Sequence, residues 1–150
     1  MRPLSLTEDG LLAGGSALWL QGWTTQIHRL TEIILPEGEI AETAGLGQVR
    51  ILRRDDRHFA VLRDWSIEAD GRRMLRPEMA IADALVHRGD PEAAWLAAPD
   101  DIDPDAFETD RMPELLRALD ALGAGPEVVA AAAGYADALD PARDAPAYRR

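Results

Sequence analysis

The central part of the chain, residues 48–76, reads QVRILRRDDRHFAVLRDWSIEADGRRMLR. Apolar side chains recur at its odd-numbered positions: Val49, Ile51, Phe59, Val61, Trp65 and Ile67. Successive side chains of a β-strand point to opposite faces, so this spacing predicts strands with one buried face. Asp70-Gly71 is typical of a two-residue hairpin turn, which sets Ile67 opposite Met74 and Glu68 opposite Arg73. We therefore expect a three-stranded antiparallel β-meander, with strands at residues 48–53, 57–69 and 72–76.

The segment before this meander favours an N-terminal helix over residues 16–35. Ser16 can cap such a helix, and apolar residues follow at spacings of three and four: Leu20, Trp23, Ile27, Leu30 and Ile34. Pro36 would end it. Two strands, at residues 18–23 and 26–35, are the alternative, because this segment also contains β-branched residues. Residues 1–15 are expected to be a loosely ordered lead-in.

The segment after the meander favours a cluster of short helices over about residues 78–139. Pro77 suits the first position of a helix, and Gly89 and Gly123 suit helix ends. A short helix is also expected after Asp90-Pro91, and residues 140–150 are expected to be a loosely ordered tail. Strands followed by helices predict a single α+β domain over residues 1–150, in which the helices cover the apolar face of the sheet.

Composition narrows the class of protein. The chain has 150 residues, 47% of them hydrophobic, and a formal net charge of −11. The lack of cysteine excludes disulfides, zinc–thiolate sites and a cysteine nucleophile. No uncharged apolar run approaches the roughly 20 residues that span a bilayer, and the first residues lack the order of a secretory signal. The chain contains no lysine or asparagine and much alanine, as proteins from high-GC bacterial genomes do. We expect a cytoplasmic bacterial protein.

Charge is unevenly distributed along the chain. Residues 50–76 contain eight arginines and five acids, whereas residues 77–150 contain six arginines and sixteen acids. We expect the acidic helical half to lie against the basic meander. The leading functional hypothesis is a non-catalytic protein-interaction module, such as an accessory subunit, adaptor or assembly factor. Such a module is expected to bind a protein partner, and the hypothesis is compatible with a homo-oligomer. Its candidate residues are Trp19 and Trp23 as an apolar anchor and Arg53, Arg54, Arg57, Arg72 and Arg73 as a charged contact.

The sequence contains no motif of an activated nucleophile and no phosphate-binding loop. The acidic run at Asp101–Asp105 starts like a calcium loop, but Ala106 and Met112 stand where that loop needs glycine and glutamate. His28, His58 and His87 have no metal-ligand spacing. We therefore expect no metal and no cofactor, and we lean against an enzyme. The alternative is a small enzyme or ligand-binding domain with a pocket between sheet and helices, using His58 or His87 and an acid.

Two local motifs favour a third hypothesis. The stretch Gly134-Tyr135-Ala136-Asp137, followed by the closing residues 146–150, resembles the end of AraC-type DNA-binding domains, where such a turn precedes a recognition helix. Trp95-Leu96 with Pro99, followed by residues 113–116, is similar to the toxin-binding domain of Xre/MbcA/ParS-type antitoxins. These resemblances imply a regulator of antitoxin or transcription-factor type. Nucleic acid is nevertheless not expected as a partner, because a net charge of −11 opposes attraction to a polyanion.

Overall fold

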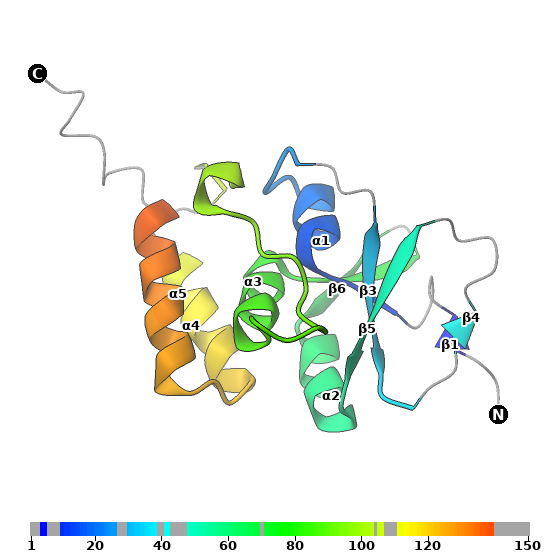
Figure 1. Ribbon diagram of the computed structural model, residues 1–150. Coiled ribbons are helices and arrows are strands. Elements are labelled where there is room, and N and C mark those ends of the chain that lie inside the picture. Colours follow the sequence, from blue (N-terminus) through cyan, green and yellow to red (C-terminus); the bar gives the residue numbers. More distant parts are fainter. Residues whose placement is uncertain are drawn as a thin grey trace, which may run out of the picture.

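The computed structural model describes residues 4–5, 10–26, 30–38, 41–42, 48–69, 71–103, 105–106 and 111–139. Figure 1 shows a twisted sheet on one side of the molecule and most of the helices on the other. The strands are β1 (Leu4–Ser5), β2 (Leu11–Leu12), β3 (Thr31–Pro36), β4 (Ala41–Glu42), β5 (Val49–Arg54), β6 (Ser66–Ala69) and β7 (Arg72–Leu75). The helices are α1 (Gly14–Leu20), α2 (Asp56–Asp64), α3 (Pro77–Val86), α4 (Arg111–Ala121) and α5 (Pro126–Leu139), with a short 3₁₀ turn at Pro99–Asp101.

The main sheet has five strands in the order β5-β3-β2-β7-β6. The pairs β3–β5 and β2–β7 are parallel, whereas β2–β3 and β6–β7 are antiparallel. Strands β1 and β4 form a separate parallel pair. The α+β class is therefore confirmed. The expected three-stranded antiparallel meander is wrong, because the sheet is mixed and also contains β2 and β3, which precede residue 48.

The expected second strand, residues 57–69, is mostly helix α2. The carboxylate of Asp55 accepts a hydrogen bond from the backbone N–H of His58 at 2.8 Å, which caps the first turn. Phe59 and Leu62, three positions apart, are the buried residues of this helix. The alternation of apolar residues was misleading here. The hairpin that follows is confirmed, since Ile67 pairs with Met74 and Glu68 with Arg73.

The expected N-terminal helix over residues 16–35 is also wrong. Strand β2 precedes α1 in the chain, and α1 ends at Leu20. Of the two strands in the alternative, the one at residues 18–23 is also wrong, because α1 extends to Leu20 and a turn follows. Residues 31–36 form β3, which overlaps the second strand of that alternative, at residues 26–35. This strand lies between β2 and β5, and its residues 32–35 are all buried. A strand that is buried on both faces has apolar residues at nearly every position. Some of these residues are three and four positions apart, so such a strand can resemble a helix in its sequence.

The helices of the second half form where expected, with one exception. Helix α3 begins at Pro77, and residues 78–85 are all buried, because it is the central helix of the molecule. It packs against α1, α4 and α5 and reaches β7. Helices α4 and α5 cover its outer side (Figure 1). The short helix expected after Asp90-Pro91 is absent, since residues 93–98 have no regular secondary structure. Within the described residues, no helix is long and apolar enough to cross a membrane.

Gly14, the first residue of α1, lies close to the Glu32 side chain and to the backbone of Trp95. Its φ of +52° lies in the left-handed region. A Cβ there would stand 3.1 Å from the backbone oxygen of Trp95 and would overlap the carboxylate of Glu32. This buried carboxylate accepts hydrogen bonds from the Trp95 backbone N–H and from Arg50, each at 3.0 Å. The position therefore requires glycine for its conformation and for the space taken by Glu32.

We expect Gly14→Ala to destabilise the protein more than Gly22→Ala. Both glycines have a positive φ, which costs about 1–2 kcal/mol for alanine, but a Cβ at Gly22 meets no atom within 4 Å. At Gly14 the overlap with Glu32 adds to this strain. Urea unfolding of the two variants measures the difference, and equal losses of unfolding free energy would contradict the close contact.

Candidate functional site

The most unusual interaction in the structure is a fully buried ion pair between β5 and α3. Asp83 on α3 is 0% exposed, and Arg54, the last residue of β5, is 2% exposed. Arg54 Nε donates to Asp83 Oδ1 at 3.0 Å, and Arg54 Nη2 donates to Asp83 Oδ2 at 2.9 Å. Two parallel charge-assisted hydrogen bonds offset the cost of removing both charges from water.

Two histidines converge on the same carboxylate. His58 Nε2 lies 3.2 Å from Asp83 Oδ1, and His87 Nδ1 lies 3.3 Å from it. His87 Nδ1 is also 2.9 Å from the backbone oxygen of Asp83, which can only accept a hydrogen bond. His87 therefore carries a proton on Nδ1. The two imidazole rings meet edge to face, with their centroids 4.8 Å apart.

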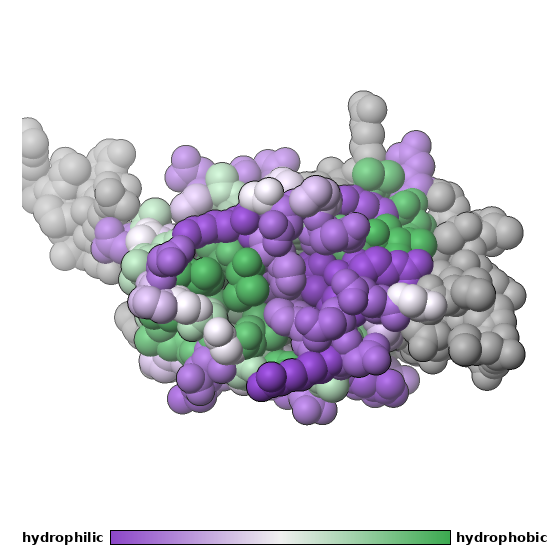
Figure 2. Space-filling view, turned by 60° about the horizontal axis from the view of Figure 1, so that its bottom comes forward, coloured by the Kyte–Doolittle hydropathy of each residue, from purple (hydrophilic) through white to green (hydrophobic). Residues whose placement is uncertain are grey.

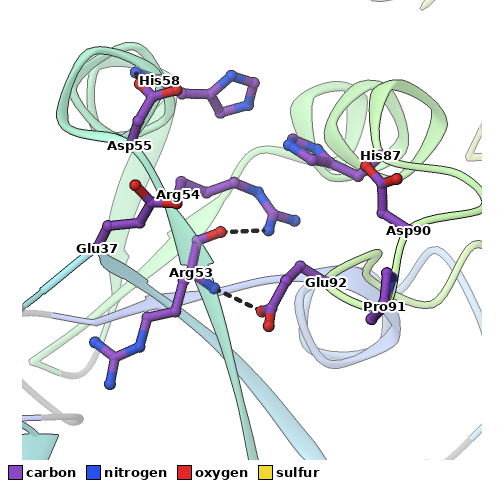
Figure 3. Close-up of a pocket in the computed structure, with 9 residues that line it drawn as sticks. All are labelled: Glu37, Arg53, Arg54, Asp55, His58, His87, Asp90, Pro91 and Glu92. Carbon is purple, nitrogen blue, oxygen red and sulfur yellow. Dashed lines mark hydrogen bonds between the residues drawn. The ribbon is translucent and has the colours of Figure 1, made fainter.

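Local sequence explains how each side chain reaches this point. The carboxyl ends of the parallel strands β3 and β5 meet at one edge of the sheet, and α2 begins there directly after Arg54. The Asp55 cap holds His58 in the first turn of α2. His87 follows α3 four residues after Asp83, so both side chains lie on one face of the helix. Figure 3 shows His58, His87 and the Arg54 guanidinium approaching one another from these elements.

The cluster changes the protonation of its members. Burial disfavours the charged form of Asp83, but hydrogen bonds from His58, His87 and Arg54 outweigh this effect and hold the pKa of Asp83 far below its ordinary value. Burial likewise disfavours protonated His87. The hydrogen bond to Asp83 and the nearby negative charge outweigh it, so the pKa of His87 is raised above its ordinary value of 6.5. Asp83 is therefore ionised throughout the neutral range.

A pocket of about 280 Å³ lies beside this cluster. Its lining residues are Glu37, Arg53, Arg54, Asp55, His58, His87, Asp90, Pro91 and Glu92. Figure 2, which brings this end of the molecule forward, shows a broad hydrophilic surface there. Glu92 accepts a hydrogen bond from the backbone N–H of Arg53 at 3.0 Å, which holds residues 90–92 against β5. The pocket is thus polar and is walled by segments from both halves of the chain.

The structure separates the residues that the sequence analysis grouped as an interaction site. Trp19 is 44% exposed, whereas Trp23 is buried in the main core. Of the five arginines, Arg54 is buried in the ion pair with Asp83, and Arg53 lines the pocket beside it. Arg57 is exposed on α2.

Arg72 and Arg73 lie on β7, which is separated from β5 by the two strands β3 and β2. Arg72 is exposed, and Arg73 pairs with Glu68 at 3.7 Å. The five arginines therefore do not form one surface. The contacts between β5 and the second half of the chain include the ion pair of Arg54 with Asp83 and a hydrogen bond from Arg50 to the backbone oxygen of Pro91 at 2.8 Å.

Sequence reasoning missed Asp83. A signal was available, because Asp83 is the one acid among the apolar residues 79–86 of a predicted helix and lies four residues before His87. An acid inside an apolar helix face indicates a buried carboxylate that needs a partner. The partner, Arg54, lies 29 residues earlier in the chain, and no comparable sequence signal identifies it as a buried residue.

The stretch Gly134–Asp137 does not form the turn that the resemblance to AraC-type domains implies. It lies inside the continuous helix α5. The buried Tyr135 hydroxyl donates a hydrogen bond to the backbone oxygen of Ala97 at 2.8 Å, and burial raises the pKa of this phenol. This tyrosine therefore anchors α5 to the segment that follows the pocket wall.

Comparisons with known proteins identify the fold only. No known protein family matches the chain, and no curated protein matches it. Among solved structures, the crystal structure of the RV2827C protein from Mycobacterium tuberculosis is similar, with a TM-score of 0.56 and 21% sequence identity. The match covers 91% of this chain and 50% of that one. The chain therefore spans about half the length of this structural neighbour.

We expect Asp83→Asn to destabilise the protein by about 3–5 kcal/mol, because the substitution leaves the Arg54 charge buried without its counter-ion. Glu68→Gln is the matched control, since it removes the partner of Arg73 from a pair in which Glu68 is 63% exposed. Its effect should stay under about 1 kcal/mol. Urea unfolding at neutral pH measures both, and a small loss for Asp83→Asn would contradict the arrangement.

We also expect the stability of the protein to fall as the pH rises above about 6.5. Because the folded state raises the pKa of His87, the stabilisation from its protonated form is complete below the unfolded value of 6.5 and is lost as the pH passes through the folded value. NMR titration of the imidazole signals, assigned with His87→Gln, measures the pKa directly. A midpoint at or below 6.5 would contradict this prediction.

Proposed function

We propose that the chain is a non-catalytic protein-interaction module whose apolar anchor is the end of α1. The observation that supports this is the pair Trp19 and Leu20, both 44% exposed and adjacent in the chain. Exposed tryptophan is unusual on a surface that has no partner, and buried tryptophan contributes strongly to protein–protein interfaces. Trp23, which the sequence analysis assigned to the same role, is buried in the core and is not part of the proposed anchor.

The anchor is held on a rigid base. Leu18 is 1% exposed and fixes α1 to the core. The side-chain amide of Gln21 donates to the backbone oxygens of Ala17 at 3.0 Å and of Leu75 at 2.8 Å, which joins the end of α1 to the end of β7. A tryptophan presented on a fixed base loses little conformational freedom on binding, which favours affinity.

The structural neighbour is consistent with a module, because a similar fold occupies about half of that longer chain. Arg57 and Arg72 remain as exposed cations for a charged contact. A partner with an apolar cavity for Trp19 and a rim of mixed charge would fit these features.

The test is to capture partners from nuclease-treated lysate of the encoding organism with the wild type, Trp19→Ala and Leu116→Ala. Leu116 on α4 is 39% exposed, so its substitution removes a comparable apolar side chain elsewhere. We expect one stoichiometric protein that the wild type and Leu116→Ala retain and Trp19→Ala releases, with at least a tenfold loss of affinity in a binding titration. Retention by Trp19→Ala would refute the anchor.

A second candidate function is ligand binding at the pocket beside His58 and His87. The alternative hypothesis of a ligand-binding domain places His58 or His87 and an acid at a pocket between sheet and helices, and both histidines line the pocket of about 280 Å³. Buried charge, a hydrogen-bonded histidine pair and a perturbed pKa are typical of functional sites. This candidate is independent of Trp19.

A further inference from the structure

We propose that His58, Asp83 and His87 bind a divalent transition-metal ion such as Zn²⁺ at the inner end of the pocket. This inference rests on the second candidate function and names its ligand class. It does not depend on the interaction proposed for Trp19. One imidazole nitrogen from each histidine and one carboxylate oxygen converge, with all three ligand atoms within 4.8 Å of one another.

The two distances from the carboxylate to the imidazoles match those in a tetrahedral metal site, and the two imidazole nitrogens lie within 4.8 Å of each other, so the rings approach slightly when they bind the ion. Asp83 Oδ1 is 3.2 Å from His58 Nε2 and 3.3 Å from His87 Nδ1. A tetrahedral ion with bonds of about 2.0–2.1 Å holds its ligand atoms about 3.3 Å apart. Two imidazoles and a carboxylate are also a ligand set that zinc accepts.

Binding exchanges protons for the ion. In the metal-free state His87 Nδ1 donates to the Asp83 backbone oxygen. To ligate through this nitrogen, a neutral His87 shifts its proton to Nε2, and a protonated His87 releases one proton to water. His58 ligates through Nε2, the nitrogen that faces Asp83. No bond other than the coordinate bonds is formed, and no oxidant or reductant is needed.

The charge around the site decides whether a dication is tolerated. Arg54 opposes it, because its guanidinium bonds both oxygens of Asp83. The acids outnumber the arginines, however: with Asp83, the carboxylates are Glu37, Asp55, Asp90 and Glu92, against the guanidiniums of Arg53 and Arg54. With neutral imidazoles the surroundings are net negative, which favours a cation. Arg54 Nη2 on Oδ2 then orients the carboxylate so that Oδ1 faces the ion.

The pocket gives the ion an open side. Three protein ligands leave one tetrahedral position, which in zinc proteins holds water or a bound molecule. Because His58 and His87 themselves line the pocket, a small ligand in it could reach that position. The site therefore has the organisation of an open metal centre rather than of a closed structural one.

The experiment titrates Zn²⁺ into the full chain, with any affinity tag removed and metal stripped by a chelator, and follows the heat of binding. Co²⁺ provides a second readout, since tetrahedral Co²⁺ absorbs visible light intensely. We expect one ion per chain, at least tenfold weaker binding for His58→Gln or His87→Gln, and no specific binding for the double variant. His28→Gln alters the remaining histidine and should bind like the wild type.

Circular dichroism verifies that each histidine variant is folded. The test uses the histidine variants and not Asp83→Asn, because that substitution is expected to destabilise the protein. Absence of saturable uptake at micromolar Zn²⁺, or full stoichiometry in the folded double variant, would overturn the metal site. Trp19→Ala should take up one ion with wild-type affinity. Failure of the metal titration would leave the partner-binding result unaffected, and failure of partner capture would leave the metal titration unaffected.

Discussion

The structure depends on keeping one buried negative charge satisfied. Asp83 lies on the central helix α3 with no contact with solvent, and an isolated carboxylate in such a place would cost several kcal/mol. Its partners come from β5, from the first turn of α2 and from the end of α3. The edge strand, the helix that follows it and the central helix must therefore meet in one arrangement, because each supplies a hydrogen bond that the others cannot replace.

A second buried carboxylate, Glu32, plays a related part. It lies on β3, next to the edge strand β5, and accepts hydrogen bonds from the Trp95 backbone N–H and from Arg50 of β5. It thus joins the sheet to the irregular segment after α3, in space that Gly14 leaves free. The two carboxylates together position residues 87–95 relative to β5. The polar pocket is a consequence of this arrangement, since its walls are the segments that the two acids bring together.

The features that could be predicted from the sequence are those with local causes. The pairing of Ile67 with Met74 follows the hairpin register predicted from Asp70-Gly71, and α3 begins at Pro77 as predicted. Asp55-Asp56 shows the limit of prediction from local sequence, because the same two residues suit either a turn between strands or the start of a helix. The helix α2 forms because Phe59 and Leu62 pack into the core. The order β5-β3-β2-β7-β6 and the pairing of Arg54 with Asp83 depend on contacts between distant residues. The histidines could be identified as candidates, but their convergence could not.

The loop at residues 90–92 has a consequence for association of the sheet. Strand β5 is an edge strand, and a free edge can pair with a strand of another molecule. Here the outward N–H of Arg53 is bonded to Glu92, and Arg50 is bonded to the backbone oxygen of Pro91. The loop that walls the pocket therefore also shields this edge from intermolecular strand pairing. The hydrogen bonds that wall the pocket on this side are thus the same ones that cover the edge of the sheet.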